Sequence, residues 1–326
     1  MDLRLALYRL ADEHRLDGPA TARLERLAGL GDPPGTLSRR LPIGLAVLAA
    51  ALLGLGLIFW IAANWATLGR FGRFAVLQGA LLSMGLAALW RPAWRAPLAL
   101  VVLLATGALL AYFGQTYQTG ADPWQLFALW AVLMLPLAWG LRSDLLWTPW
   151  VLVAFVGLSL WIQAHTGHQW RVEPDDLAVH MVGWAAALAL VLTMAAPGRR
   201  LTGSGPWALR TAAMLAVVVV TITALGGLFA RDIAAHYGLG LLALAALAAA
   251  FVPARSFDVF ALSAAALGLN TLLVAGLGRL LFEHSGRGDP IGRLFLLGLV
   301  AAGLLAASVS AVLRLARARA QSGAAA

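Results

Sequence analysis

Residues 42–63 read PIGLAVLAAALLGLGLIFWIAA, an apolar run of 22 residues without a charged side chain. A helix rises about 1.5 Å per residue and the hydrocarbon core of a bilayer is about 30 Å thick, so about 20 such residues cross it. Similar runs follow through most of the chain. The predicted spans are residues 42–63, 72–90, 97–115, 124–141, 146–163, 177–196, 207–229, 237–253, 256–282 and 291–315. The sequence therefore predicts an all-α fold, a polytopic bundle of about ten transmembrane helices.

The composition of the chain agrees with this prediction. Of the 326 residues, 61% are hydrophobic and only 12% are charged, and the mean hydropathy is +0.82. A soluble domain usually carries about 25% charged residues, so a chain with half that share cannot form a surface that water covers. We therefore predict that the lipid bilayer covers much of the outside of the protein.

The net charge of +9 comes from arginines, which lie mainly in short loops between the apolar runs. We predict no nucleic-acid partner, because positive charge in such loops instead sets the orientation of a membrane protein. If the N-terminus is cytoplasmic, the inside segments hold Arg39, Arg40, Arg91, Arg95, Arg142, Arg199, Arg200, Arg255, Arg314, Arg317 and Arg319. The outside loops hold Arg70, Arg73, Arg171, Arg231 and Arg287. This excess inside and an even number of spans predict that both termini are cytoplasmic.

The first 40 residues differ from the rest, because charges of both signs alternate there with apolar residues. Leucines recur at helical spacing, and Asp17 with Pro19 marks the start of a second helix. No apolar core precedes a small-residue cleavage site, so the first span is expected to act as the insertion signal. The predicted organisation is a cytoplasmic helical hairpin and linker over residues 1–40, a transmembrane bundle over 41–319 and a tail over 320–326.

The most informative polar stretch reads GQTYQTGADPW, residues 114–124, and lies near the predicted non-cytoplasmic surface. Amide side chains without partners are costly in hydrocarbon, so its glutamines should face protein or a wet cavity. We predict a polar pocket formed by Asn64, Gln115, Thr116, Tyr117, Gln118 and Asp122. Two alternatives remain, in which Asp122 with Pro123 only starts a helix and Asn64 only ends one.

Two stretches also carry a resemblance to a known family. Residues 114–130 (GQTYQTGADPWQLFALW) and residues 59–65 (FWIAANW) are similar to the bacterial predicted-membrane-protein family called domain of unknown function 2157. The layout resembles that family too, with a short helical segment followed by apolar helices. The resemblance implies a multi-pass protein of the bacterial inner (plasma) membrane and carries over no catalytic residue.

Other polar residues fall within or beside the predicted spans. His180 and Asn270 lie inside spans, where a polar residue is a hint of function, although Asn270 can also simply bond a neighbouring helix. The region before His180 holds side chains of the types that bind divalent ions: His165, His168, Glu173, Asp175 and Asp176. Their spacing matches no metal signature, and acidic residues also suit a helix N-terminus, so we predict no metal site.

Catalytic chemistry finds little support in the sequence. The chain has no cysteine, which excludes disulfides, thiolate metal sites and thiol nucleophiles. We find no Walker loop, dinucleotide fingerprint, zinc-protease motif or serine elbow, and we predict no cofactor. An enzyme therefore ranks last among the possible functions.

Two functions remain from the sequence. The first is transport of a small molecule or lipid, or ligand sensing, through the polar pocket near the outer face. No inverted repeat and no buried pair of opposite charges supports ion-coupled transport. The alternative is a non-catalytic scaffold or signalling component whose amphipathic N-terminal hairpin binds a cytoplasmic protein partner.

Overall fold

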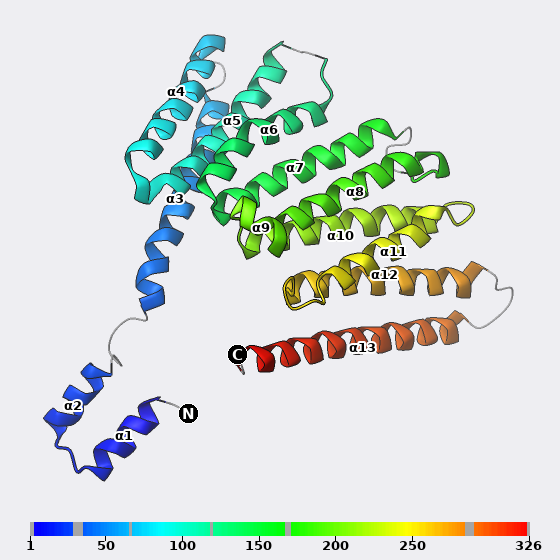
Figure 1. Cartoon of the computed structure of the whole chain (residues 1–326). Coiled ribbons are helices and arrows are strands. Elements are labelled where there is room, and N and C mark those ends of the chain that lie inside the picture. The colour runs from blue at the N-terminus through cyan, green and yellow to red at the C-terminus, as the bar shows by residue number, and fades with distance from the viewer. Residues whose placement is uncertain are drawn as a thin grey trace. The chain divides into compact units, whose positions relative to one another are not determined.

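The computed structural model describes residues 3–28, 35–64, 67–117, 120–166, 171–283 and 290–324, which are helical and contain no strand (Figure 1). The elements are α1 (Leu3–Glu13), α2 (Gly18–Leu27), α3 (Gly35–Ala63), α4 (Gly69–Trp90), η1 (Pro92–Trp94), α5 (Arg95–Tyr117), α6 (Pro123–Leu141), α7 (Asp144–His165), η2 (Pro174–Asp176), α8 (Leu177–Met194), α9 (Ala196–Thr202), α10 (Pro206–Leu228), α11 (Ala235–Ala250), α12 (Val259–Glu283) and α13 (Pro290–Ala324). They form two compact units, Met1–Phe59 and Trp60–Ala326.

The first unit contains α1, α2 and most of α3. The helix α2 starts where the sequence predicts, because the Asp17 carboxylate accepts the backbone N–H of Ala20 at 2.9 Å. The helices α1 and α2 contact each other. Both leave large apolar side chains exposed, namely Leu5, Tyr8, Leu10 and Leu27.

Eight helices in the described part of the chain are long and apolar enough to cross a membrane, where the sequence predicted about ten spans. The multi-pass helical membrane bundle is therefore confirmed, with a lower count. Two predicted spans fall short: the apolar stretch Leu41–Leu57 in α3, and α11 (Ala235–Ala250). The 16 residues of α11 extend only about 24 Å, less than the ~30 Å of a hydrocarbon core.

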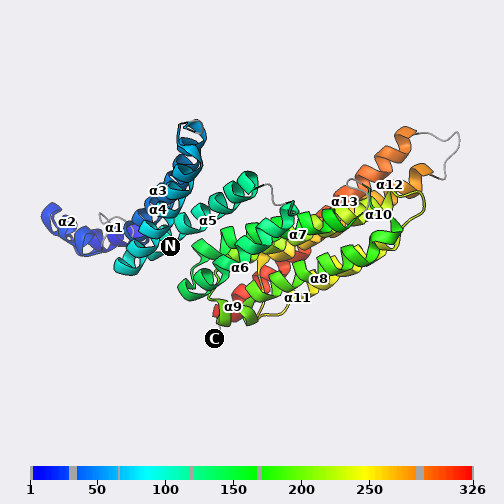
Figure 2. The same ribbon diagram turned by 90° about the horizontal axis from the view of Figure 1, so that it is seen from above.

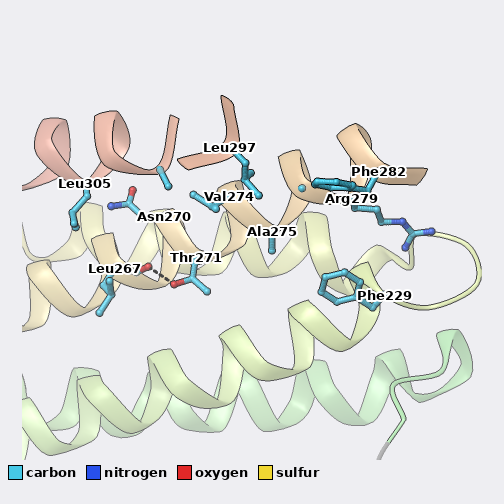
Figure 3. Close-up of a pocket in the computed structure, with 12 residues that line it drawn as sticks. Phe229, Leu267, Asn270, Thr271, Val274, Ala275, Arg279, Phe282, Leu297 and Leu305 are labelled. Carbon is cyan, nitrogen blue, oxygen red and sulfur yellow. Dashed lines mark hydrogen bonds between the residues drawn. The ribbon is translucent and has the colours of Figure 1, made fainter. Parts of the chain in front are cut away.

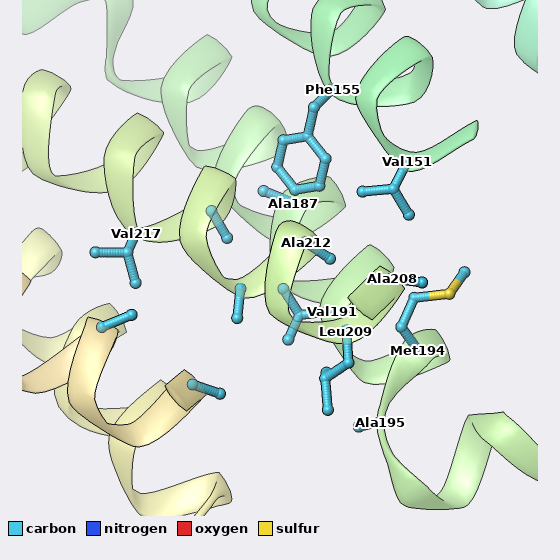
Figure 4. Close-up of a cluster of buried hydrophobic side chains, with 14 of the residues drawn as sticks. Val151, Phe155, Ala187, Val191, Met194, Ala195, Ala208, Leu209, Ala212 and Val217 are labelled. Atoms are coloured by element: carbon cyan, nitrogen blue, oxygen red, sulfur yellow. The ribbon is translucent and has the colours of Figure 1, made fainter. Parts of the chain in front are cut away.

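The second unit is organised around α10, which packs against α7, α8, α11 and α12. Figure 2 shows these helices running side by side. The face of α10 toward α7 and α8 carries small residues, which let the backbones approach closely without a hydrophobic drive from lipid. Figure 4 shows the resulting core, in which Ala208 and Ala212 meet Val151 and Val191, and all four are fully buried.

Indole N–H groups tie neighbouring helices together within this unit. Trp150 on α7 donates to the Ala131 carbonyl on α6 at 2.8 Å. Trp184 on α8 donates to the Thr223 hydroxyl on α10 at 2.9 Å. A buried indole needs such an acceptor, so these bonds fix which faces of the helices meet.

Polar contacts join α7, α10 and the start of α12 at one end of the second unit. The Asp144 carboxylate, at the start of α7, accepts the backbone N–H groups that open α10: Gly205 at 3.0 Å, Trp207 at 2.8 Å and Ala208 at 2.9 Å. At the same end, Arg210 of α10 pairs with Asp258 before α12 at 3.3 Å. The Asp258 carboxylate also accepts the Ala261 N–H at 2.9 Å, which caps α12.

The short helix α11 reaches both ends of the second unit despite its length. Near its start, His236 contacts His180 in the first turn of α8. Just after its end, the Val252 carbonyl accepts a hydrogen bond of 3.1 Å from Arg319, near the end of α13.

Candidate functional site

A cavity of about 700 Å³ lies between the end of α5 and the start of α6. It is lined by Leu110, Ala111, Phe113, Gly114, Gln115, Gly120, Ala121, Asp122, Pro123, Gln125, Leu126 and Leu129. Its polar side chains are one carboxylate, Asp122, and two amides, Gln115 and Gln125, while the rest of the wall is apolar or glycine. Two of the residues of the predicted polar pocket, Gln115 and Asp122, thus line one cavity.

The local sequence explains how the chain turns from α5 into α6. Gly120 has φ of +66°, a left-handed conformation that glycine adopts without a steric penalty. Asp122 is extended and Pro123 takes the first position of α6, where its missing N–H costs nothing. The Asp122 carbonyl accepts the Gln125 N–H at 3.0 Å, whereas its carboxylate makes no capping bond. The backbone of Asp122 therefore starts the helix, and its carboxylate is left at the cavity.

Tyr117 lies in an aromatic cluster between α4 and α5. Its ring centroid is 4.7 Å from that of Phe113 and 6.2 Å from that of Phe74. Tyr112 joins the same cluster, and its hydroxyl donates to the Arg70 carbonyl at 3.2 Å. This cluster links the ends of α4 and α5 and contributes Phe113 to the cavity wall.

The other residues of the predicted pocket lie outside the cavity lining. The Asn64 amide donates to the Trp60 carbonyl of its own helix at 2.9 Å, as expected of a residue that ends a helix. Thr116 is half-buried on α5 and does not line the cavity. Gln118 lies outside the described residues.

Sequence reasoning missed Gln125, which lines the cavity from the first turn of α6. The signal was present, because Gln125 stands three residues after Asp122, the position that shares its face at the start of a helix. Its place inside the predicted apolar span 124–141 hid this signal.

Asn270 lies at the boundary of two other cavities, between α12 and α13. The larger, about 670 Å³, is almost entirely apolar (Figure 3). Asn270 donates to the Ser308 hydroxyl of α13 at 2.8 Å, and Thr271 donates to the Leu267 carbonyl of its own helix at 2.9 Å. The polar groups of this wall are thus satisfied within the protein, as in the alternative predicted for Asn270.

His180 is buried at the start of α8, with its Nδ1 atom 3.0 Å from the Asp176 carbonyl. The ring of His165, at the end of α7, is tilted against Trp161 at 4.7 Å and meets Trp124 edge-on at 5.9 Å. His168 lies outside the described residues. Among the residues that are described, no three His, Cys, Asp or Glu side chains are grouped to hold a metal ion.

Comparison with known proteins adds one match. Residues 8–147 match the model of a family described as predicted membrane protein (DUF2157), and this range includes the whole cavity between α5 and α6. No curated protein and no solved structure matches the chain. The resemblance predicted from residues 59–65 and 114–130 is therefore confirmed, and over residues 8–147 the chain has the sequence pattern of the predicted membrane protein family DUF2157.

Proposed function

We propose that the protein binds a small ligand in the cavity between α5 and α6, from the non-cytoplasmic side of a bacterial inner membrane, in order to transport or sense it. The observation that carries the proposal is the convergence of Gln115, Asp122 and Gln125 on one cavity. Its volume of about 700 Å³ falls within the ~300–1,000 Å³ of ordinary ligand sites, and its few polar groups on an apolar wall are also typical of them.

The lining favours a ligand with hydrogen-bond donors at one end and an apolar body. An ionised carboxylate only accepts hydrogen bonds, so Asp122 favours an ammonium, amidinium or hydroxyl group. The amides of Gln115 and Gln125 donate and accept, and can orient the same polar end. Leu110, Leu126 and their apolar neighbours suit an aliphatic or aromatic body.

The orientation of the bundle is supported by the charges at its ends. The loops beside Asp144 and Asp258 carry Arg142, Arg199, Arg200 and Arg255. The loops at the other ends of these helices carry Glu173, Asp175, Asp176 and Asp232 as well as Arg171 and Arg231. Arginine accumulates on the cytoplasmic side of membrane proteins, so this charge difference favours cytoplasmic termini and an outward cavity.

A second function is favoured by the first unit. Its helices expose Leu5, Tyr8, Leu10 and Leu27 beside charged residues, which is the pattern of an amphipathic docking surface. The protein would then act as a scaffold or signalling component, and the hairpin would bind a cytoplasmic protein. A pull-down with the full chain and with a Leu5→Asp, Leu10→Asp variant distinguishes the two, because only a docking role loses its partner in the variant.

A ligand screen by thermal stability tests the proposed binding. A ligand present at about 100 times its Kd stabilises the folded state by about 2.7 kcal/mol. We expect cationic or hydroxylated amphiphilic compounds to raise the melting temperature of the purified protein, and Asp122→Asn to abolish the shift. Asn270→Leu, in the apolar α12–α13 wall, is the matched control and should keep it. Shifts that persist in Asp122→Asn would contradict the proposal.

A further inference from the structure

Two buried histidines meet at the first turns of α8 and α11. The side chain of His180 is 3% exposed and that of His236 is fully buried. Their rings meet edge to face at 4.9 Å, and Nε2 of His236 lies 3.2 Å from Nδ1 of His180. The residues are 56 positions apart, so this pair is a tertiary feature that joins two helices.

Hydrogen-bond geometry fixes where the ring protons lie. Nδ1 of His180 is 3.0 Å from the carbonyl oxygen of Asp176, which can only accept, so Nδ1 carries the hydrogen. The same N–H points to Nε2 of His236, which must then be the lone-pair nitrogen. His236 is therefore neutral with its hydrogen on Nδ1, a buried atom for which the described residues offer no acceptor.

The neutral pair can bind one additional proton and keep its hydrogen bonds, but it cannot do so with two. A proton on Nε2 of His180 leaves its Nδ1–H in place, and the resulting imidazolium donates more strongly to both acceptors. A second proton must go to Nε2 of His236, because its Nδ1 is already occupied. Two N–H groups would then face each other across 3.2 Å, between two positive rings.

We propose that His180 and His236 form a proton-binding site that holds one proton as a hydrogen-bonded imidazole–imidazolium pair and opens the first turns of α8 and α11 when a second proton binds. The site is independent of the cavity between α5 and α6 and adds proton binding to the proposed function. Its ligand is the proton, supplied by bulk water on that side of the membrane.

Burial of the two imidazoles opposes a positive charge, and one acidic neighbour offsets part of that cost. Asp176 lies in the turn that leads into α8, and its Oδ2 atom is buried without a hydrogen-bond partner among the described residues. A carboxylate so placed stabilises one positive charge nearby. One negative charge against two positive rings leaves the doubly protonated pair uncompensated.

The groups on the other packed elements are engaged elsewhere. On α11, the Tyr237 hydroxyl donates to the Leu272 carbonyl of α12 at 3.1 Å. On α12, Arg279 pairs with Glu283 and also donates to the Ala230 carbonyl at 3.0 Å. The α10 residue that hydrogen-bonds α8 is the neutral Thr223, and on α7 the Nδ1 atom of His165 lies 2.8 Å from the Trp161 carbonyl. Asp232, in the segment before α11, acts on Arg279.

The packing allows the two first turns to separate without unfolding the bundle. The helices α8 and α11 each pack far more against α10 than against each other. Loss of the histidine contact therefore frees the starts of both helices while α10 holds their remaining length. Opening of this kind is local and has a lower free energy than global unfolding.

Amide hydrogen exchange of the full-length protein in nanodiscs measures this opening. Exchange is followed from about pH 8 to about pH 4, across the ordinary imidazole transition near 6.5, after correction for the intrinsic rate. In the wild type we expect peptides that cover the first turns of α8 and α11 to exchange roughly tenfold faster in acid, and α10 to stay protected. Tenfold corresponds to about 1.4 kcal/mol.

Two substitutions separate proton binding from packing. His236→Gln keeps an acceptor for the N–H of His180, but its amide does not bind a proton in this pH range. Its acid transition should therefore be absent. His180→Asn keeps a hydrogen-bonding group opposite His236 but removes one of the two rings that become positive, so its acid transition should also be absent, while its exchange at about pH 8 should match that of the wild type. The wild-type transition in either variant, exchange at about pH 8 that is already faster than the wild type in both variants, or a wild type without any transition would each overturn the proposal.

Discussion

The three hydrogen bonds to Asp144 give the sharpest prediction for stability. Oδ1 accepts from Gly205 and Ala208, and Oδ2 accepts from Trp207. Asp144→Ala leaves three backbone N–H groups at the start of α10 without their partner. A bond to a charged acceptor contributes about 1.5–3 kcal/mol when buried, and an N-cap about 0.5–2 kcal/mol.

Because Asp144 is only half-buried, we take about 1 kcal/mol for each bond, and expect Asp144→Ala to lower the free energy of unfolding by about 3 kcal/mol. Asp144→Asn keeps one oxygen, which can stay at the Oδ1 position with its two bonds. Its amide nitrogen then faces the Trp207 N–H, so this variant should lose one bond, or about 1 kcal/mol.

The assay is unfolding of the purified protein in mixed micelles of mild detergent and SDS, followed by circular dichroism. Asp175→Ala removes an exposed carboxylate and serves as the control, with an expected loss below about 1 kcal/mol. Equal losses in Asp144→Ala and Asp144→Asn, or a loss in Asp144→Ala no larger than in the control, would refute the reasoning.

Two further predictions concern packing between helices. Gly107→Ala should cost about 1–3 kcal/mol, because the added Cβ would overlap the ring of Trp130, which donates to the Leu103 carbonyl. Gly79→Ala, with open space around it, should not destabilise the protein in the same SDS-unfolding assay. A double-mutant cycle on Asn270 and Ser308 should give a coupling of about 0.6 kcal/mol, the average for such bonds in membranes. A coupling of zero would contradict this prediction, because it would mean that the bond between Asn270 and Ser308 does not stabilise the bundle.

Hydrophobic patterning predicted most of the helices because charged residues separate the apolar runs from one another. The close pair α6 and α7, for example, is separated by Arg142 and Ser143, and Arg142 takes the left-handed conformation that ends α6. The short helix α9 was not predicted, because its seven residues fall in a basic loop and carry no apolar period. The span predicted over residues 237–253 became the shorter helix α11, because the helix already ends at Ala250.

Part of the candidate site could be predicted from the local sequence, and the rest depends on tertiary packing. Gln115 and Asp122 share a cavity because α5 and α6 are consecutive helices joined by a short turn. Tyr117 faces elsewhere, because residues two apart on a helix lie on nearly opposite sides. The partner of His180 could not be predicted, because the contact with His236 depends on how α8 and α11 pack around α10.

The measurement that tests the central claim most directly is labelling of single cysteines by a membrane-impermeant maleimide in intact cells, made possible by a chain without cysteine. Asp122→Cys and Gln125→Cys report on the cavity. Leu133→Cys, 48% exposed on the apolar side of α6, controls for lipid-facing positions, and Arg200→Cys controls for the cytoplasmic side. The account predicts labelling at positions 122 and 125, none at 133, and labelling at 200 only after permeabilisation. Cysteines at 122 and 125 that stay unlabelled in intact cells, while the folded protein is present, would contradict an outward, water-accessible ligand site.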